Sequence, residues 1–238
     1  MTTQAYLQSP LRFSAHHYRS AVAVNRPPHE LERRALNVIV ATAGIIVTLP
    51  LMIILAVLVK LTSPGPVFYT QMRVGIDRRS RRARKDGNTR DRDIGGAMFR
   101  IYKFRTMRTE SAASQVWARQ GDSRVTAIGR VLRKYRLDEL PQLFNVLRGD
   151  MNVVGPRPEQ PEIFVHLREQ INAYEWRQRV LPGITGWAQV NLCYDQSIDD
   201  VRRKVAYDLA YIRRASALED LRIMMQTLPV MLGRKLGW

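Results

Sequence analysis

The sequence lacks the residues from which disulfide frameworks and cysteine-based zinc sites are built. Cys193 is the only cysteine among 238 residues, so an intramolecular disulfide is excluded and a zinc site with cysteine ligands is disfavoured. No metal-ligand spacing relates the four histidines, which are His16, His17, His29 and His166. The simplest interpretation is a reduced protein that faces the cytosol.

Acidic residues are also scarce, since 21 of them stand against 38 lysines and arginines and leave a net charge of +17. Such an excess indicates polyanionic partners, namely nucleic acid, an anionic membrane or phosphorylated substrates. The length accommodates one domain, or one domain with a membrane element.

Charged residues are absent altogether between Ala35 and Val59. A helix of about 25 residues is long enough to cross a hydrocarbon core of about 30 Å. The run follows a long polar leader and exceeds the apolar region of a signal peptide. A buried core helix is the alternative, disfavoured because soluble domains rarely carry so long an uncharged run. We therefore expect a flexible polar leader over residues 1–30 and a membrane helix over residues 31–62.

Pro50 lies in the middle of this run and predicts a kink, because proline removes one donor and crowds the preceding turn. Thr48 is placed to satisfy freed backbone groups. Basic residues flank both ends, with Arg33 and Arg34 before the run and Lys60 after it. The positive-inside tendency would place both ends in the cytoplasm. From these residues alone, a re-entrant helix and a spanning helix are nearly equal alternatives.

The segment after the membrane helix begins with a turn at residues 63–66 and predicts a short strand at residues 67–69. Residues 78–92 are charged and lack apolar periodicity. We interpret them as a loop that touches anionic headgroups, at about 1 kcal/mol per basic residue, or as a solvated disordered loop. Residues 99–104 alternate like a second strand.

The rest of the chain reads as mainly helical. Helices are predicted over residues 162–179, 198–214 and 217–232, with a glycine-rich turn at 182–187. The last helix is either packed in the core or amphipathic at the membrane interface. Its apolar stripe consists of Leu221, Met224, Met225, Leu228, Met231 and Leu232.

A pair of adjacent carboxylates, Asp138 and Glu139, precedes another predicted helix. That helix is indicated by apolar residues at helical spacing and ends at Gly149. Asp138 would then be its N-cap, with Glu139 in the first turn. Capping does not explain the surrounding cations, and an acid pair among arginines suits a site for phosphates and a divalent metal. The apolar residues are Leu140, Leu143, Phe144 and Leu147, and the cations are Arg124, Arg130, Arg133, Lys134, Arg136, Arg148 and Arg157.

Several motifs in register resemble the bacterial sugar transferase family, the monotopic polyprenol-phosphate phosphoglycosyl transferases. The likeness extends from about residue 31 to the C-terminus, in the family's order. The motifs are residues 63–68 (SPGPVF), 102–107 (YKFRTM), 137–142 (LDELPQ), 149–159 (GDMNVVGPRPE), 181–190 (LPGITGWAQV) and 207–212 (YDLAYI).

This resemblance implies transfer of a sugar 1-phosphate from a nucleoside diphosphate sugar, a UDP-sugar, to undecaprenyl phosphate, with release of UMP. It would be the first membrane step of exopolysaccharide or glycoconjugate synthesis. Asp138 would be the nucleophile that forms a phosphosugar intermediate, and Glu139 would help to hold Mg²⁺. Mg²⁺ prefers oxygen ligands shared with substrate phosphates, and positive charge is needed before an anionic carboxylate can approach a diphosphate.

The resemblance also assigns the cations. Lys103, Arg133 and Arg157 lie in motifs that bind phosphates in the family, and arginine offers phosphate a bidentate contact. Arg105 is a weaker candidate, with pairing to an acid such as Asp150 as its alternative.

Asp208 lies in the C-terminal motif. It would support the metal or an arginine, with a purely structural ion pair as the alternative.

The fold that follows is α+β and mostly helical. It combines a re-entrant membrane helix kinked at Pro50 with a compact cytoplasmic catalytic domain over residues 63–238, containing a short strand element and amphipathic interfacial helices. We expect the minimal catalytic form of the family, on the cytoplasmic face of the bacterial inner membrane and in contact with anionic lipids. Two departures stand out: Leu49 replaces the serine usual before the proline, and Leu192-Cys193 replaces a common Gly-Arg.

Two other functions remain as alternatives. A membrane-anchored nucleic-acid-binding protein would explain the charge, but the sequence has no recognised nucleic-acid module and the acid pair would serve no purpose, so nucleic acid is not a predicted partner. A catalytically inactive assembly scaffold is the second alternative, and the intact acid pair argues against it. The sugar, the glycan pathway and homo-oligomerisation are left open by these residues.

Overall fold

The structure is a computed structural model, which describes residues 30–78, 95–108, 122–192 and 197–231. The predicted leader, apart from Glu30, lies outside the described residues. Most of the predicted basic loop at 78–92 and Cys193 do so as well.

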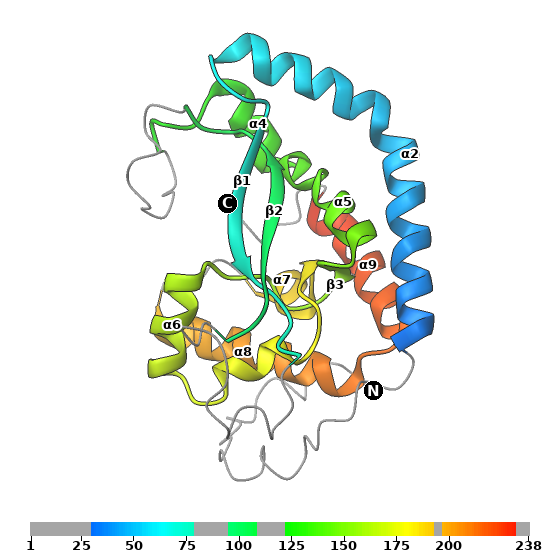
Figure 1. Cartoon of the computed structure of the whole chain (residues 1–238), viewed down its shortest axis with the longest axis vertical. Helices are drawn as coiled ribbons and strands as arrows, with labels where there is room; N and C mark the ends of the chain where they lie inside the picture. The colour runs from blue at the N-terminus through cyan, green and yellow to red at the C-terminus, as the bar shows by residue number, and fades with distance from the viewer. Residues whose placement is uncertain (1–29, 79–94, 109–121, 193–196, 232–238) are drawn as a thin grey trace.

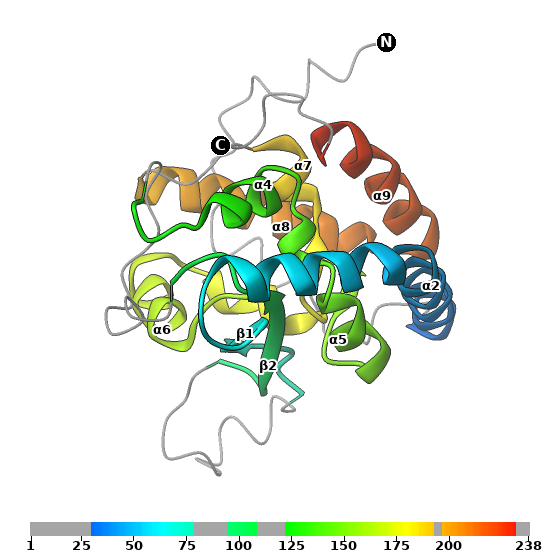
Figure 2. The same ribbon diagram turned by 90° about the horizontal axis from the view of Figure 1, so that it is seen from above.

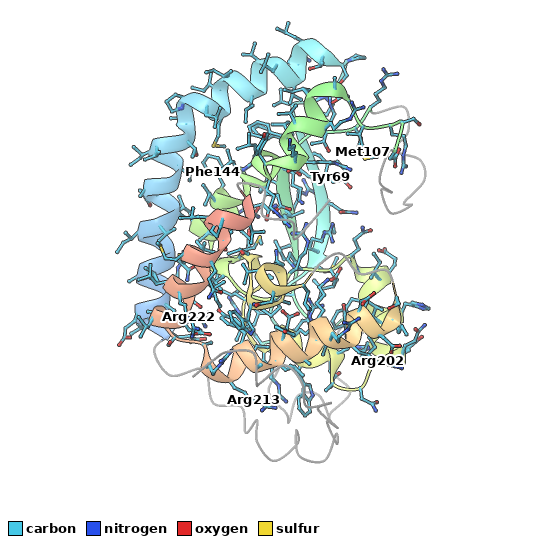
Figure 3. The ribbon with its side chains drawn as sticks, turned by 180° about the vertical axis from the view of Figure 1, so that it is seen from behind. Tyr69, Met107, Phe144, Arg202, Arg213 and Arg222 are labelled. Carbon is cyan, nitrogen blue, oxygen red and sulfur yellow. The ribbon has the colours of Figure 1, made fainter. Side chains whose placement is uncertain are left out.

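The chain begins its described part with one long helix, α2 (Glu30–Thr62), which contains Pro50. It is long and apolar enough to cross a membrane, and only 17% of its most apolar stretch is buried inside the molecule. A core helix of a soluble domain would be mostly covered, so the exposed apolar surface favours membrane contact. In Figure 3 the side chains on its outer face point away from the rest of the molecule.

The axis of α2 changes direction partway along (Figure 1). The hydroxyl of Thr48 donates to the carbonyl of Gly44 at 2.7 Å, a local bond of the kind that bends helices. One portion of α2 packs near α5 (Gln142–Arg148) and α9 (Ala217–Met231). Met52, Leu55 and Val59 instead pack against Phe104 and α4 (Ala127–Lys134). Seen from above, this second portion crosses over the strands (Figure 2). Re-entry through one membrane face stays a prediction.

Both predicted strands are present, as the antiparallel pair β1 (Phe68–Val74) and β2 (Met98–Phe104), in which Tyr69 lies opposite Lys103. β1 extends well beyond the predicted residues 67–69. Among the described residues, a side chain and not a third strand covers the outer edge of β2. Asn145 of α5 donates to the carbonyl of Arg100 at 2.7 Å and accepts from the backbone N–H of Tyr102 at 3.2 Å. This buried amide therefore fixes α5 against the hairpin, because a buried strand edge must have its polar groups satisfied.

The predicted helix around residues 140–147 is confirmed as α5, and Gly149 ends it with a left-handed φ of 81°. The N-cap role predicted for Asp138 is wrong. Asp138 lies inside a separate 3₁₀ turn, η3 (Leu137–Glu139), and Pro141 occupies the position before α5. An N-cap residue normally has an extended backbone and lies just before its helix. Asp138 does not, because Arg136 has a left-handed backbone (φ 54°) and turns the chain from α4 directly into the 3₁₀ turn that contains Asp138.

A second, parallel strand pair, β3 (Asn152–Val154) and β4 (Gly183–Thr185), lies beyond α5. The backbones approach closely just after β3. A Cβ on Gly183 would lie 2.0 Å from the backbone nitrogen of Gly155, so only glycine fits there. This contact holds the start of the segment that carries Arg157.

The predicted helix over residues 162–179 is wrong in its length. The chain forms α6 (Pro161–Gln170) and then a 3₁₀ helix, η4 (Tyr174–Arg179). Ala173 between them has a φ of 64°, which ends regular helix. After a short α7 (Trp187–Asn191), the helix predicted over 198–214 is confirmed as α8 (Ile198–Arg214), and the last predicted helix as α9.

The apolar stripe predicted for the last helix is divided by the fold. Ile223 is fully buried and Met224 packs against the core. Leu221, Met225 and Leu228 are instead 46%, 61% and 53% exposed. The helix thus presents an open apolar face, as the interfacial alternative requires. Figure 3 places Arg202 and Arg213 of α8 and Arg222 of α9 at the end of the molecule formed by these helices.

Candidate active site

The two carboxylates of η3 are both buried, with Asp138 only 9% and Glu139 only 5% exposed. Burying a charge is costly unless it is paired and hydrogen-bonded. The two carboxylates differ in how they are paired, and their pKa values therefore shift in opposite directions.

Glu139 is held by two cations from distant parts of the chain. Its Oε1 accepts from Lys103 Nζ at 2.7 Å and from Arg157 Nη2 at 2.9 Å. Arg136 Nη1 lies 4.0 Å from the other oxygen, Oε2. Burial by itself would raise the pKa of Glu139, but Arg157 and Lys103 hold that pKa well below its usual range. Glu139 is therefore a permanent anion at neutral pH.

Asp138 lies beside this ion-paired group without a comparable partner. Within the described part of the chain, no side chain hydrogen-bonds to its carboxylate. Burial and the neighbouring Glu139 raise the pKa of Asp138 to about 6, against the opposing charges of Lys103, Arg133 and Arg157. The carboxylate is thus ionised at neutral pH but poorly stabilised, as a nucleophile should be.

The structure brings together three of the cations predicted from the sequence. Lys103 and Arg157 contact Glu139, and the charge of Arg133 also acts on Asp138. Arg133 lies in the last turn of α4, where its Nε donates to the hydroxyl of Thr106 at 2.9 Å. Lys103, Arg133 and Arg157 thus create a positive electrostatic potential around Asp138, which would allow an anionic phosphate to approach it.

Arg105 lies elsewhere. The residue is 4% exposed, and its guanidinium donates to the carbonyls of Val59 (3.2 Å), Ser63 (2.6 Å) and Pro64 (2.7 Å). It therefore satisfies the C-terminal carbonyls of α2 and the following turn, as basic residues commonly do. These contacts give no support to its predicted role in binding phosphate.

The alternative pairing of Arg105 with Asp150 is wrong. The Asp150 carboxylate contacts Arg148 at 3.3 Å and Asn145 at 3.2 Å. The sequence could not distinguish these partners, because strand and turn positions decide which side chain each guanidinium can reach.

Asp208 supports an arginine, which was one of its predicted roles. Its Oδ2 accepts from Arg177 Nε at 2.7 Å, and both side chains are almost fully buried. Arg177 was missed at the sequence level, since it lies in a stretch that matches no motif and was expected to be plain helix. Its Nη2 donates to the backbone carbonyl of Arg157 at 3.0 Å.

A metal site made by protein alone is not present among the described residues, where no three His, Cys, Asp or Glu side chains cluster. Mg²⁺, however, typically takes only one or two carboxylates and completes its coordination with phosphates and water. The acid pair fits that donor set. Glu139 Oε2 is the oxygen that neither Lys103 nor Arg157 occupies.

The chain is similar to one group of known proteins. The model of the family described as bacterial sugar transferase matches residues 29–234. A UDP-N-acetylgalactosamine-undecaprenyl-phosphate N-acetylgalactosaminephosphotransferase of Aeromonas hydrophila is 41% identical over 208 residues, which cover 87% of this chain and 45% of the relative. The chain therefore spans less than half the length of that relative.

Two further relatives are covered more completely. A UDP-glucose:undecaprenyl-phosphate glucose-1-phosphate transferase of Caulobacter vibrioides is 37% identical over 85% of this chain and 70% of the relative. The exopolysaccharide production protein ExoY of Sinorhizobium fredii is 34% identical over 86% of this chain and 87% of its own length.

Proposed function

The chain belongs to the bacterial sugar transferase family, and we propose that it transfers a sugar 1-phosphate from a UDP-sugar to undecaprenyl phosphate. The names of its relatives describe this class of reaction. The observation that carries the proposal is the contrast within the acid pair. Glu139 is ion-paired to Lys103 and Arg157, whereas Asp138 beside it forms no ion pair with any of the residues that the structure describes.

In the first step, an oxygen of Asp138 attacks the phosphorus that bears the sugar. A bond forms between the carboxylate and phosphorus, the diphosphate bridge breaks, and UMP leaves with the bonding electrons. In the second step, an oxygen of undecaprenyl phosphate attacks the same phosphorus, which forms the lipid diphosphate sugar and releases the Asp138 carboxylate. Each step is a phosphoryl transfer between anions, so charge neutralisation and alignment supply most of the acceleration.

The surrounding cations have defined tasks in this scheme. Arg133, Lys103 and Arg157 bind the phosphate oxygens and offset the charge that Asp138 brings. Glu139 orients Lys103 and Arg157 and would hold Mg²⁺, which supplies further positive charge to the phosphates when bound.

The membrane helix would bring the lipid acceptor to this site. α2 packs against α4, which carries Arg133, and against α5, which follows the acid pair. A site built on these elements lies beside the apolar surface, where a polyprenol chain is soluble while its phosphate reaches the cations. We propose that the catalytic domain lies on the cytoplasmic face of the inner membrane, where the net charge of +17 favours contact with anionic lipids.

The activity is tested by incubating the detergent-purified protein with undecaprenyl phosphate, Mg²⁺ and a panel of UDP-sugars while UMP release is measured. Turnover with at least one donor is expected. Asp138→Asn should abolish it, whereas Asp199→Asn, the same change at an exposed position of α8, should not. Failure of every donor under conditions where a related transferase works would refute the proposal.

A further inference from the structure

Two guanidinium groups hold the backbone of the segment that carries Arg157, that of buried Arg177 and that of half-buried Arg73. Arg177 Nη2 donates to the carbonyl of Arg157 at 3.0 Å, and Arg73 Nη1 donates to the next carbonyl, that of Pro158, at 3.1 Å. Because the Arg157 side chain reaches Glu139 from this segment, the direction of that reach depends on where its backbone is fixed.

The guanidinium of Arg177 is itself fixed by an acid and by an aromatic residue. Its Nε donates to Asp208 at 2.7 Å and its Nη1 to the hydroxyl of Tyr174 at 2.8 Å. The carbon of its guanidinium also lies 5.0 Å from the centre of the Tyr174 ring. Although burial opposes the charge, Tyr174 and Asp208 raise the pKa of Arg177, so the group stays protonated.

The shape of the guanidinium links these contacts. It is planar and its donors diverge at fixed angles, so the bond from Nε to Asp208 sets the direction in which Nη2 points. A lysine could pair with Asp208 but could not present a second donor along that fixed direction. We propose that Arg177, oriented by Asp208, is a positioning residue that holds Arg157 in place to bind the substrate diphosphate.

Stability alone is a poor account of this pair. Replacing a buried ion pair with apolar residues of similar size is often neutral or stabilising. Such a replacement supplies neither the donor to the Arg157 carbonyl nor the positive charge opposite Glu159, whose Oε1 lies 3.7 Å from Arg177 Nη1. The role rests on the proposed function, in which Arg157 binds phosphate.

The protein contains a second buried triad of the same chemistry that serves as a matched control. Arg33 of α2 donates through Nε to Asp220 at 2.9 Å and through Nη2 to the hydroxyl of Tyr211. This triad fastens α2 to α8 and α9. In the described part of the chain, its members make no hydrogen bond to residues 157–159.

The experiment compares four forms of the full-length protein in detergent. These are the wild type, Arg157→Gln, the double variant Arg177→Met/Asp208→Leu, and the double variant Arg33→Met/Asp220→Leu. Binding of inorganic pyrophosphate in the presence of Mg²⁺ is measured by titration calorimetry, and the midpoint of thermal unfolding, Tm, is measured for each. Pyrophosphate lacks the sugar and the lipid, so this readout is independent of turnover.

We expect Arg157→Gln and Arg177→Met/Asp208→Leu each to weaken pyrophosphate binding about 10-fold, the loss of one charged hydrogen bond. The Arg33→Met/Asp220→Leu variant should bind like the wild type whatever its Tm. Arg177→Lys, which keeps the charge opposite Asp208, should weaken binding as well and serves if the double variant does not fold. In UMP release, these Arg177 variants should raise KM for the donor more than they lower kcat.

Two results would overturn the inference, and they differ. Wild-type affinity in both Arg177 variants, with affinity lost in Arg157→Gln, would refute the positioning role alone. Unchanged affinity in Arg157→Gln, or no binding by the wild type, would refute the phosphate role of Arg157 and the inference with it. The transfer reaction itself would still be judged by UMP release.

Discussion

Asp138 and Glu139 are adjacent in one 3₁₀ turn, yet Lys103 and Arg157 both donate to the same oxygen of Glu139, and no side chain among the described residues hydrogen-bonds to the Asp138 carboxylate. Two carboxylates in one turn repel each other, so the pair titrates as a unit. The cations stabilise the charged form of Glu139 and lower its pKa, whereas the pKa of Asp138 is raised to about 6. The fold thereby gives two chemically similar side chains opposite pKa shifts.

The first prediction concerns the pH dependence of the reaction. Asp138 must be ionised to attack, so the rate of forming the phosphosugar intermediate should rise with pH, with an apparent pKa of about 6, and level off above it. Single-turnover release of UMP between pH 4.5 and 8.5 measures this. A rate that is flat from pH 5 to 8 would contradict the assignment of Asp138 as the nucleophile.

The second prediction concerns stability. The pKa of Asp138 is raised from 3.8 to about 6 in the folded chain, so folding takes up a proton between these values and the folded state loses stability as pH rises through that window. The loss amounts to about 3 kcal/mol at most. Asp138→Asn avoids it and should be more stable than the wild type at pH 8 by about 1–3 kcal/mol.

Denaturant unfolding of both proteins at several pH values checks this second prediction. The difference in the free energy of unfolding should shrink as pH falls from 6 to 4. A difference that does not vary with pH would show that Asp138 is not strained in the folded state.

The third prediction separates Glu139 from the metal. Because Glu139 occupies Lys103 and Arg157, Glu139→Gln should free both cations for an added anion. We expect this variant to bind pyrophosphate without Mg²⁺ at least as tightly as the wild type does, while UMP release falls by about 100-fold or more. Chelation of Mg²⁺ should abolish turnover of the wild type. Weaker pyrophosphate binding by Glu139→Gln without metal would contradict this account.

The fourth prediction concerns Arg105, whose donors satisfy three carbonyls around the end of α2. Arg105→Met should lower the free energy of unfolding by about 1–3 kcal/mol for the buried carbonyls left unpaired, with the KM for the donor unchanged. Calorimetry and steady-state kinetics measure the two effects. A large rise in KM at constant stability would restore the phosphate role that the sequence suggested.

The fifth prediction concerns topology. Leu31 and Leu61 lie near opposite ends of α2 and are 87% and 78% exposed. If the helix is re-entrant, a cysteine at either position in a Cys193→Ser background should resist a membrane-impermeant thiol reagent in intact cells and react after permeabilisation. Labelling of Leu31→Cys alone in intact cells would instead establish a spanning helix.

Elements whose signal is local were predicted well from the sequence. The uncharged run predicted α2, alternation predicted β2, and the helices α8 and α9 begin where they were expected. These patterns report which face of an element is buried, and that depends on residues a few positions apart. The break at Ala173 escaped prediction because alanine rarely adopts a left-handed backbone and nothing nearby signals it.

The sequence by itself determined that this protein has an apolar helix long enough to cross a membrane, an excess of basic residues and an acid pair among cations, because composition and short-range periodicity are enough for each. Only the tertiary structure decided that Glu139 pairs with Lys103 and Arg157, which are 36 and 18 positions away. It also decided that Arg105 donates to carbonyls at the end of α2 and that Arg177 donates to the backbone carbonyl of Arg157. The reason is physical: a long charged side chain can reach many partners, and its choice depends on which backbone segments the hydrophobic core brings within a few ångströms.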